Sequence, residues 1–362
     1  AVSRENGQWT LSTRKLVAGG ATFNGTATAK SAADGMTELG ANLHADKLTV
    51  AGLLSPLHDA QLPNQDVTAQ PASATEIWPT GVFNLAAFEF VKGTVRLGFG
   101  SLSLQPGIAA RSGALEIALA PGSIAITDIK GQAIGGALLG AVALTKAPSG
   151  IKFDGTLKID GADLAHLSAA ARGKATLDAK AAAQAQSAAG LLAVLNGSGS
   201  LTLDEASVPA PGPSASAAVI ASVLANKLPN QPQDVHAALL EAVAASKADL
   251  GSRTIPIVIT DGVAKLETVN LESPSGKVST ATVVDLTTLA IDSAWKLSAI
   301  VPPLPPPSEP LPGWVAPAPK GPLPPATVVY TGALNHLPEV TAALDASDMQ
   351  RELAVRQLER NV

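Results

Sequence analysis

The sequence predicts a mainly β protein of repeated, antiparallel strand units, with a few short helices and an inserted helical pair. Three observations predict this. Apolar and polar residues alternate along most of the chain, glycine-containing breaks recur about every 8–12 residues, and one unit is repeated. Hydrophobic residues make up 46% of the chain but aromatic residues only 3%. Such thin side chains suit the lining of a surface better than the filling of a thick core.

The repeat is carried by a double glycine. The stretch GGATFNG at 19–25 returns as GGALLG at 135–140, after the flanks WTLSTRKLVA and GSIAITDIKGQAI respectively. A degenerate third copy covers 261–293. Each copy is predicted as a strand, a polar hinge, a second strand broken at the glycines, further strands and a short helix. We expect the glycines to bend the sheet within strands; the alternative is ordinary hairpin glycines. The predicted bends are Gly19, Gly20, Gly135 and Gly136.

Alternation assigns the apolar face. In IKFDGTLKID, at 151–160, apolar residues fall on one side of a strand and lysine, threonine and aspartate on the other. An open sheet with one apolar face needs a cover from a helix, a second sheet or a ligand. If the sheet curls with this apolar face inside, the face lines a groove. The candidate groove residues are Val95, Leu97, Phe99, Leu115, Ile117, Leu119, Ile151, Phe153, Leu157, Ile159, Leu201, Leu203 and Leu297.

Three kinds of segment depart from the strand pattern. A short helix is predicted over 187–195 and a helical pair over about 214–250, whose second helix begins at a first-turn proline. The final stretch, DMQRELAVRQLERNV, has Glu352 and Arg356 four residues apart and is predicted as a solvated helix. The predicted units are a first groove repeat over 1–75, a second over 76–186, a carboxy-terminal unit over 187–301, a proline-rich segment over 302–325, and a final strand and helix over 326–362.

The order of several motifs resembles the carboxy-terminal region of AsmA-like proteins in their alphaproteobacterial form, which are related to repeating β-groove, bridge-like lipid transfer proteins. The motifs lie within about 8–299, most of the chain. They are WPTGVFNLAAF followed by GTVRLGFGSLSL; LAPGSIAITDIKGQAIGGALLGAVAL; LKIDGADLAHL; LLAVLNGSGSLTLDEASV; and ITDGVAKLETVNLESPSGKVSTATVVDL. Two features depart from the family pattern: the proline-rich stretch is longer, and the third copy has Ser275-Gly276 in place of two glycines.

The resemblance implies an elongated, curled antiparallel sheet of repeated units that forms an open hydrophobic groove. It also implies a periplasmic protein, attached to the inner membrane by an anchor outside this chain, that carries phospholipid along this groove toward the outer membrane. We expect the chain to be a segment of a longer protein, because it opens within a strand-like pattern and stops within a helical one. Phospholipid acyl chains are the expected partner, with other envelope proteins docking on the proline-rich segment if it is more than a stiff spacer. The alternative is a non-catalytic periplasmic scaffold or chaperone that aids outer-membrane protein assembly.

The residues predict no enzyme and no cofactor. The chain has no cysteine, and its five histidines lack the spacing of metal ligands. A net charge of −5 without any basic run argues against nucleic acid. A carbohydrate-active enzyme is disfavoured by the scarcity of aromatic residues. The sequence leaves lipid and polypeptide open as cargo.

Overall fold

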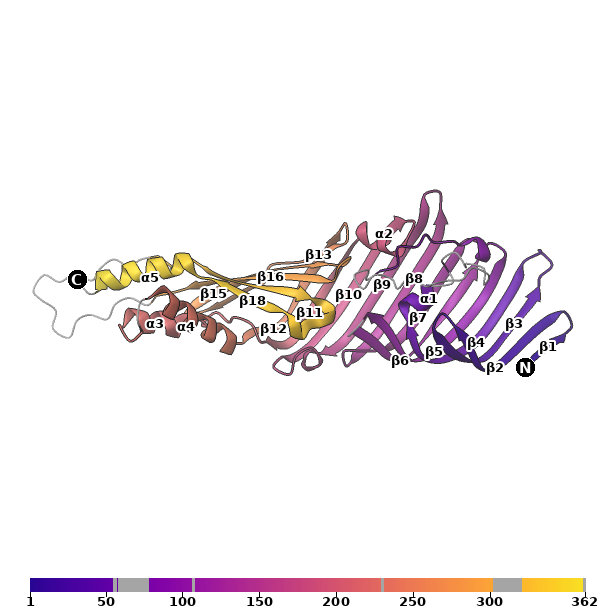
Figure 1. Ribbon diagram of the computed structural model, residues 1–362, viewed down its shortest axis with the longest axis horizontal. Helices are drawn as coiled ribbons and strands as arrows, with labels where there is room; N and C mark the ends of the chain where they lie inside the picture. Colours follow the sequence, from indigo (N-terminus) through magenta and orange to yellow (C-terminus); the bar gives the residue numbers. More distant parts are fainter. Residues whose placement is uncertain (55–56, 58–77, 106–107, 229–230, 302–320, 361–362) are drawn as a thin grey trace, which may run out of the picture.

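The computed structural model describes residues 1–54, 57, 78–105, 108–228, 231–301 and 321–360. Within these ranges, 18 strands form one continuous sheet. The sheet is elongated and curled, and its strands lie across the long axis of the amino-terminal half (Figure 1). The predicted fold class is confirmed: a mainly β chain with few short helices.

The strands follow one another along the sheet almost in chain order. From β1 to β13 each strand pairs with the next; β13 and β14 both pair with β15, and the order continues to β18. The strands are β1 (Val2–Glu5), β2 (Gln8–Ala18), β3 (Ala21–Ser31), β4 (Thr37–Thr49), β5 (Val91–Gln105), β6 (Ile108–Ala120), β7 (Ser123–Ala133), β8 (Gly136–Ala147), β9 (Gly150–Asp163), β10 (Arg172–Ala185), β11 (Asn196–Val208), β12 (Ala248–Thr260), β13 (Val263–Leu266), β14 (Asn270–Ser273), β15 (Gly276–Asp285), β16 (Ala290–Ala299), β17 (Ala326–Ala333) and β18 (Thr341–Asp345).

One pairing breaks the antiparallel pattern. Strands β4 and β5 run parallel, so the chain must return from the end of β4 to the start of β5 by a crossover connection. The described parts of this crossover include α1 (Val50–Leu54) and the 3₁₀ helix η2 (Ala86–Phe88). The same segment carries the predicted boundary near residue 75, which lies outside the described residues.

The repeat is visible as equivalent strands. The first copy is β2, β3, β4 and α1, and the second is β7, β8, β9 and the 3₁₀ helix η3 (Leu164–His166). The double glycines, however, do not bend strands. Gly19 and Gly20 form the two-residue turn between β2 and β3, both with positive φ, and Gly135 ends the equivalent turn before Gly136 opens β8. The expectation of bends at these four glycines is therefore wrong, because two-residue hairpin turns need the positive φ that glycine adopts freely.

The irregularities lie instead at the polar hinges. The register of β2 with β3 shifts between Thr13 and Leu16, and that of β7 with β8 shifts between Ile126 and Ile129. In the third copy the equivalent strand is interrupted, so that β13 and β14 are separate strands on β15. An extra residue on one strand bends it and increases its twist. The bulge in the first strand of each repeat is thus the bend.

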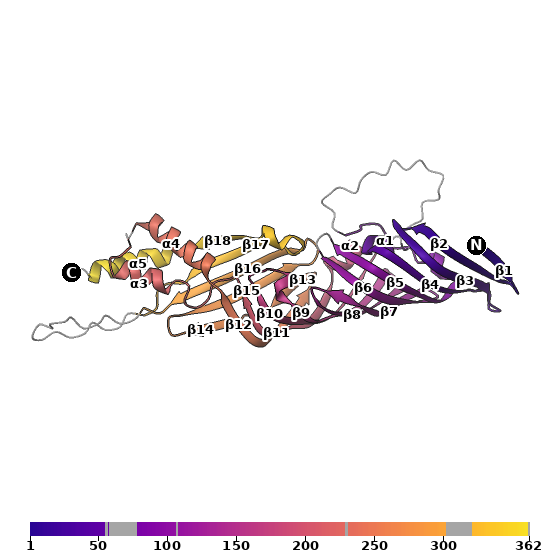
Figure 2. The ribbon, with the colours of Figure 1, turned by 90° about the horizontal axis from the view of Figure 1, so that it is seen from below.

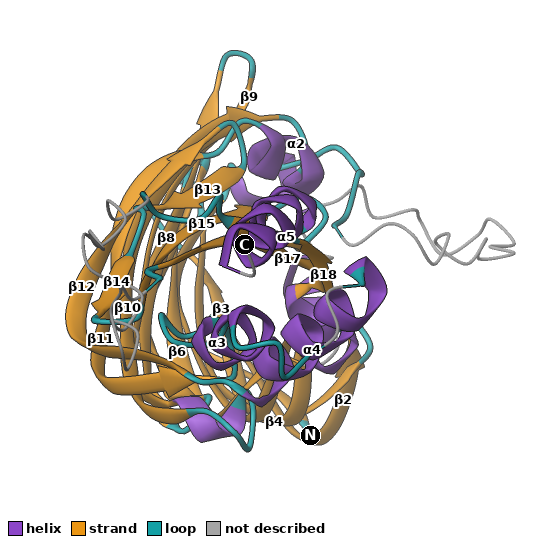
Figure 3. Cartoon of the chain, turned by 90° about the vertical axis from the view of Figure 1, so that its left-hand side faces the viewer, coloured by secondary structure: helices purple, strands orange, loops and turns teal. Residues whose placement is uncertain are grey.

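The helices gather on the inner side of the curl and at the carboxy-terminal end (Figures 2 and 3). Two of them, α3 and α4, occupy the segment of the predicted helical pair, and the described residues 321–325 join their cluster through Leu323. Most of the proline-rich segment, 302–320, lies outside the described residues. Besides α1, η2 and η3, the helices of the described residues are α2 (Ala188–Ala193), α3 (Ala217–Leu224), α4 (Pro232–Ala245), η4 (Leu334–Glu339) and α5 (Ser347–Arg360).

Helix α5 is not the solvated helix that its charges predict. Met349 and Leu353 are fully buried against α3 and α4, in a cluster that we call the helical cluster. The Gln357 side chain donates to the Val223 carbonyl oxygen at 2.9 Å, which fixes α5 to α3. The expected Glu352–Arg356 pair forms at 2.8 Å, but it lies at the edge of a packed interface. Across the described residues, no helix is long and apolar enough to cross a membrane.

Candidate functional site: an apolar groove

A single row of apolar residues crosses the concave face of the sheet. Following directly opposed residues from strand to strand gives one residue on each of 16 strands, and all are alanine, glycine, valine, leucine or isoleucine. At about 4.8 Å between neighbouring strands, the row extends for roughly 70 Å. We call it the central row: Val2, Leu11, Ala27, Ala41, Val95, Ile117, Ile126, Val142, Gly155, Ala181, Gly197, Ile259, Ala264, Val284, Ile291 and Gly332.

A second row of the same character runs beside it, two residues further along each strand. Its members pack with those of the central row, so the concave face forms an apolar strip rather than a line. The row contains Trp9, Ala29, Leu39, Gly93, Leu119, Ile124, Leu144, Phe153 and Ala183.

The convex face carries a row of polar side chains from β2 to β7. The row next to the central row on that side is Ser12, Thr26, Asn42, Arg96, Glu116 and Thr127. The Arg96 Nε and Glu116 Oε2 atoms form an ion pair at 2.9 Å. Side chains of neighbouring residues in a strand point to opposite faces. The period-two pattern of the sequence therefore places apolar side chains on the concave face of these strands and polar side chains on their convex face.

The structure places the predicted groove residues on the concave side but at different depths. Val95 and Ile117 belong to the central row itself, while Phe153, Ile159 and Leu201 are half-buried beside it. Leu157 is the most open, with 39% of its surface exposed. The others are buried by the protein's own side chains: Leu97, Phe99, Leu115, Leu119, Ile151, Leu203 and Leu297.

The crossover between β4 and β5 lines one wall of the groove. Leu57, Phe83 and Leu85 pack on Leu119 and Ile151 in a group that we call the crossover cluster. Sequence reasoning missed this contribution. Its only signal was the apolar stretch WPTGVFNLAAF, which does not say where the segment lies.

Backbone hydrogen bonds hold the crossover segment in place along the edge of the groove. The Phe83 N–H donates to the Gln186 carbonyl oxygen at 2.7 Å, and the Ala189 N–H donates to the Pro79 carbonyl oxygen at 3.0 Å. The indole Nε1 of Trp78 donates to the Leu286 carbonyl oxygen at 3.0 Å. The segment thus connects the second strand repeat to α2 and to the turn after β15.

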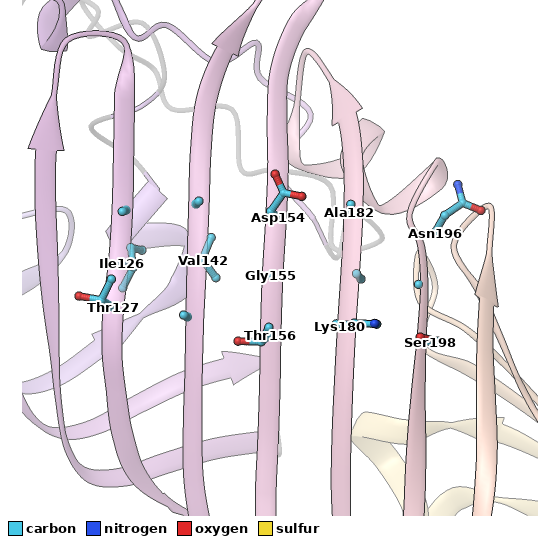
Figure 4. Close-up of a pocket in the computed structure, with 15 residues that line it drawn as sticks. Ile126, Thr127, Val142, Asp154, Gly155, Thr156, Lys180, Ala182, Asn196 and Ser198 are labelled. Carbon is cyan, nitrogen blue, oxygen red and sulfur yellow. The ribbon is translucent and has the colours of Figure 1, made fainter.

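A hollow of about 460 Å³ crosses β7 to β11, and it lies on the outer face (Figure 4). Ile126 and Val142 pack into the concave clusters, so the residues before and after them point outward. The outward-pointing residues on the two sides of the central row line the hollow, so it is a shallow trough between two rows of side chains. These residues are Ala125, Thr127, Ala141, Ala143, Asp154, Thr156, Lys180, Ala182, Asn196 and Ser198. This trough is therefore not part of the groove.

Charged groups lie away from the groove floor. Among the described residues, no three histidine, aspartate or glutamate side chains gather in a way that could hold a metal ion. Asp34 lies in a turn, and Asp285 and Asp345 are the last residues of β15 and β18. Hydrogen bonds lower the pKa values of these three carboxyl groups. The concave strip between the walls is lined by apolar side chains.

Asp285 supports the turn that holds Trp78. Its Oδ1 accepts hydrogen bonds from the Thr287 hydroxyl at 2.5 Å and from the Thr287 and Thr288 N–H groups at 2.8 and 3.2 Å. The hydroxyl bond is the main cause that lowers the pKa of Asp285 below its ordinary value of 3.8.

We expect Asp285→Ala to lower the free energy of unfolding by about 1 kcal/mol at neutral pH. The native carboxylate stabilises the fold fully above its ordinary pKa, and this contribution is lost as the pH falls through the lowered value. Urea unfolding of both proteins over a pH series checks this. A difference that stays constant into the acid range would contradict it.

No family model, curated protein or solved structure matches this chain. The fold and the site therefore define the class by themselves: an open, curled antiparallel sheet with an apolar concave strip and a polar convex face.

Proposed function

We propose that the protein carries phospholipid along the concave groove. The observation that supports this most strongly is the central row, which has no polar side chain on any of its 16 strands. Leu11, Ala27, Ala41, Val95 and Ile117 are all half-buried, so the protein's own side chains cover them only in part. An acyl chain would complete their burial.

The energetics suit movement along the strip. Each CH₂ group removed from water contributes about 0.8 kcal/mol, so a chain of a dozen or more such groups gains on the order of 10 kcal/mol. This is the scale of what the chain gives up on leaving a bilayer. Alanine, glycine and valine at successive positions of the row provide apolar area without deep pockets, which favours sliding over fixed binding.

The proposal places the protein in the bacterial envelope. The resemblance to the AsmA-like family supports a periplasmic location, an inner-membrane anchor outside this chain and a part in outer-membrane biogenesis. The function proposed involves no catalysis and no cofactor. The proline-rich segment would connect the protein to other envelope proteins or act as a spacer.

A matched pair of variants tests lipid carriage. Ala41 lies in the central row, and Asn42, its neighbour in β4, is exposed on the convex face. We expect Ala41→Asp to lower phospholipid transfer about tenfold, equivalent to 1.4 kcal/mol, because a charge on the strip must stay hydrated. Asn42→Asp should leave the transfer unchanged.

The assay follows a fluorescent phospholipid between donor and acceptor vesicles of phosphatidylethanolamine and phosphatidylglycerol. Far-UV circular dichroism checks that both variants fold. Transfer no faster than without protein, or an equal effect of the two substitutions, would overturn the proposal.

A second candidate function has its own supporting observation. The short strand β1 pairs with β2 only over Gln8–Leu11, so within the described residues Thr13–Ala18 pair on one side only. An open strand edge of this kind can bind an extended polypeptide. Capture of an unfolded outer-membrane protein that is insensitive to Ala41→Asp, without lipid transfer, would favour this scaffold or chaperone function.

A further inference from the structure

The central row changes character at β12. From Leu11 to Gly197 its residues are half-buried, whereas Ile259, Ala264 and Val284 are each only 8% exposed. The strip therefore continues in composition, but side chains of the protein cover it from β12 to β15. Ile291 and Gly332, beyond this covered part, are again half-buried.

The cover is a packed group that we call the end cluster. Leu195, Ile257 and Ile259 form its centre with Ala264 and Val284. Leu192 from α2 and Leu334 from η4 pack on it. Beyond it, the concave side of β15 to β17 is filled by a further core in which Val278 and Val328 are at most 1% exposed and the Trp295 and Tyr330 rings meet edge to face at 6.4 Å.

Phe153 lies between the crossover cluster and the end cluster. Its side chain packs on both the crossover cluster and the end cluster. The ring also lies over Gly155, where a Cβ atom would come within 2.6 Å of the Phe153 Cζ atom. Gly155 is a member of the central row, so the aromatic ring crosses the strip at β9. A side chain at this position would displace the ring.

We infer that the groove is blind at its carboxy-terminal end: the open lane runs from Leu11 on β2 to Val142 on β8, the ring of Phe153 crosses it at β9, and the end cluster closes it at β12. Acyl chains are held in this amino-terminal lane and do not pass through the interior of β12 to β17. They enter and leave it through the amino-terminal end or the open side. This inference rests on the proposed function and specifies which part of the strip the lipid occupies.

The test maps lipid contacts along the row in the full 362-residue chain. The protein is mixed with vesicles of phosphatidylethanolamine and phosphatidylglycerol that contain a phospholipid with a diazirine in its acyl chain. After irradiation, mass spectrometry locates the adducts. We expect adducts at Ala27 and Ala41, and about tenfold fewer at Ile259 and Val284. A tenfold ratio corresponds to 1.4 kcal/mol, which is the free energy that we expect a lipid to spend on displacing the side chains that cover these two residues.

The outcomes separate the two proposals. Adducts of equal frequency at Ala41 and Val284 would support lipid binding but overturn the blind groove. No adducts on the concave face above the level at Asn42 would overturn the proposed function itself.

A variant tests the role of the ring. We expect Phe153→Ala to extend the adducts to Ala181 and Gly197, which are half-buried beyond the ring, whereas Phe153→Leu, which keeps most of the volume, leaves them confined. Thermal unfolding of both variants shows whether the end cluster remains folded. If Phe153→Ala folds and its adducts stay confined to the amino-terminal lane, the ring is not the barrier.

Discussion

Phe99→Ala is expected to lower the free energy of unfolding by about 3–5 kcal/mol, the range for deleting a fully buried aromatic ring. Phe99 is 2% exposed, and its ring lies over Gly113 on the neighbouring strand β6, where a Cβ atom would be 2.3 Å from the ring's Cζ atom. The surrounding residues Leu97, Leu115 and Leu138 belong to a cluster on which α1 packs. A glycine neighbour cannot extend into the space that the ring leaves.

The control is Phe90→Ala, which deletes the same ring just before β5 at a position that is 68% exposed. Its effect is expected to stay within about 0.5 kcal/mol. Urea unfolding followed by circular dichroism compares the two. Equal losses would mean that Phe99 does not pack as described.

Leu353→Ala is expected to cost about 2–5 kcal/mol, because Leu353 is fully buried between α5 and the helices α3 and α4. The same helix provides the control, since Leu358 is 67% exposed and its replacement by alanine should change stability by less than about 0.5 kcal/mol. Thermal unfolding measures both. If Leu353→Ala lowered the stability as little as Leu358→Ala, α5 would be a solvated helix.

The two pairs of variants also separate the parts of the molecule. Phe99 belongs to the groove half and Leu353 to the helical cluster at the opposite end. A loss of lipid transfer in folded Leu353→Ala protein would show that the helical end contributes to carriage, which the blind groove does not require.

Much of the groove could be predicted from alternation alone. In β9, Ile151, Phe153 and Ile159 share the concave side, because the period of a strand is two whatever its neighbours are. The repeat likewise predicted equivalent strands, since the same hinge and turn residues recur in each copy. These are local properties, and each can be read from a short stretch of sequence.

Other features depend on residues far apart in the chain. The position of the double glycines was misassigned because a glycine pair suits both a hairpin turn and a bend, and only strand pairing distinguishes them. Helix α5 was misassigned because its charges were visible in the sequence while its partners, α3 and α4, lie more than a hundred residues away.

The sequence by itself determined the strands, their apolar face and the order in which they follow one another, because alternation and turn residues act locally. The tertiary structure alone decided which part of that face is accessible. The parallel pairing of β4 with β5 placed a crossover on one wall. The ring of Phe153 crossed the strip at β9, and α2 and η4 helped to cover it from β12. The sequence does not distinguish an apolar residue that a lipid covers from one that another side chain covers.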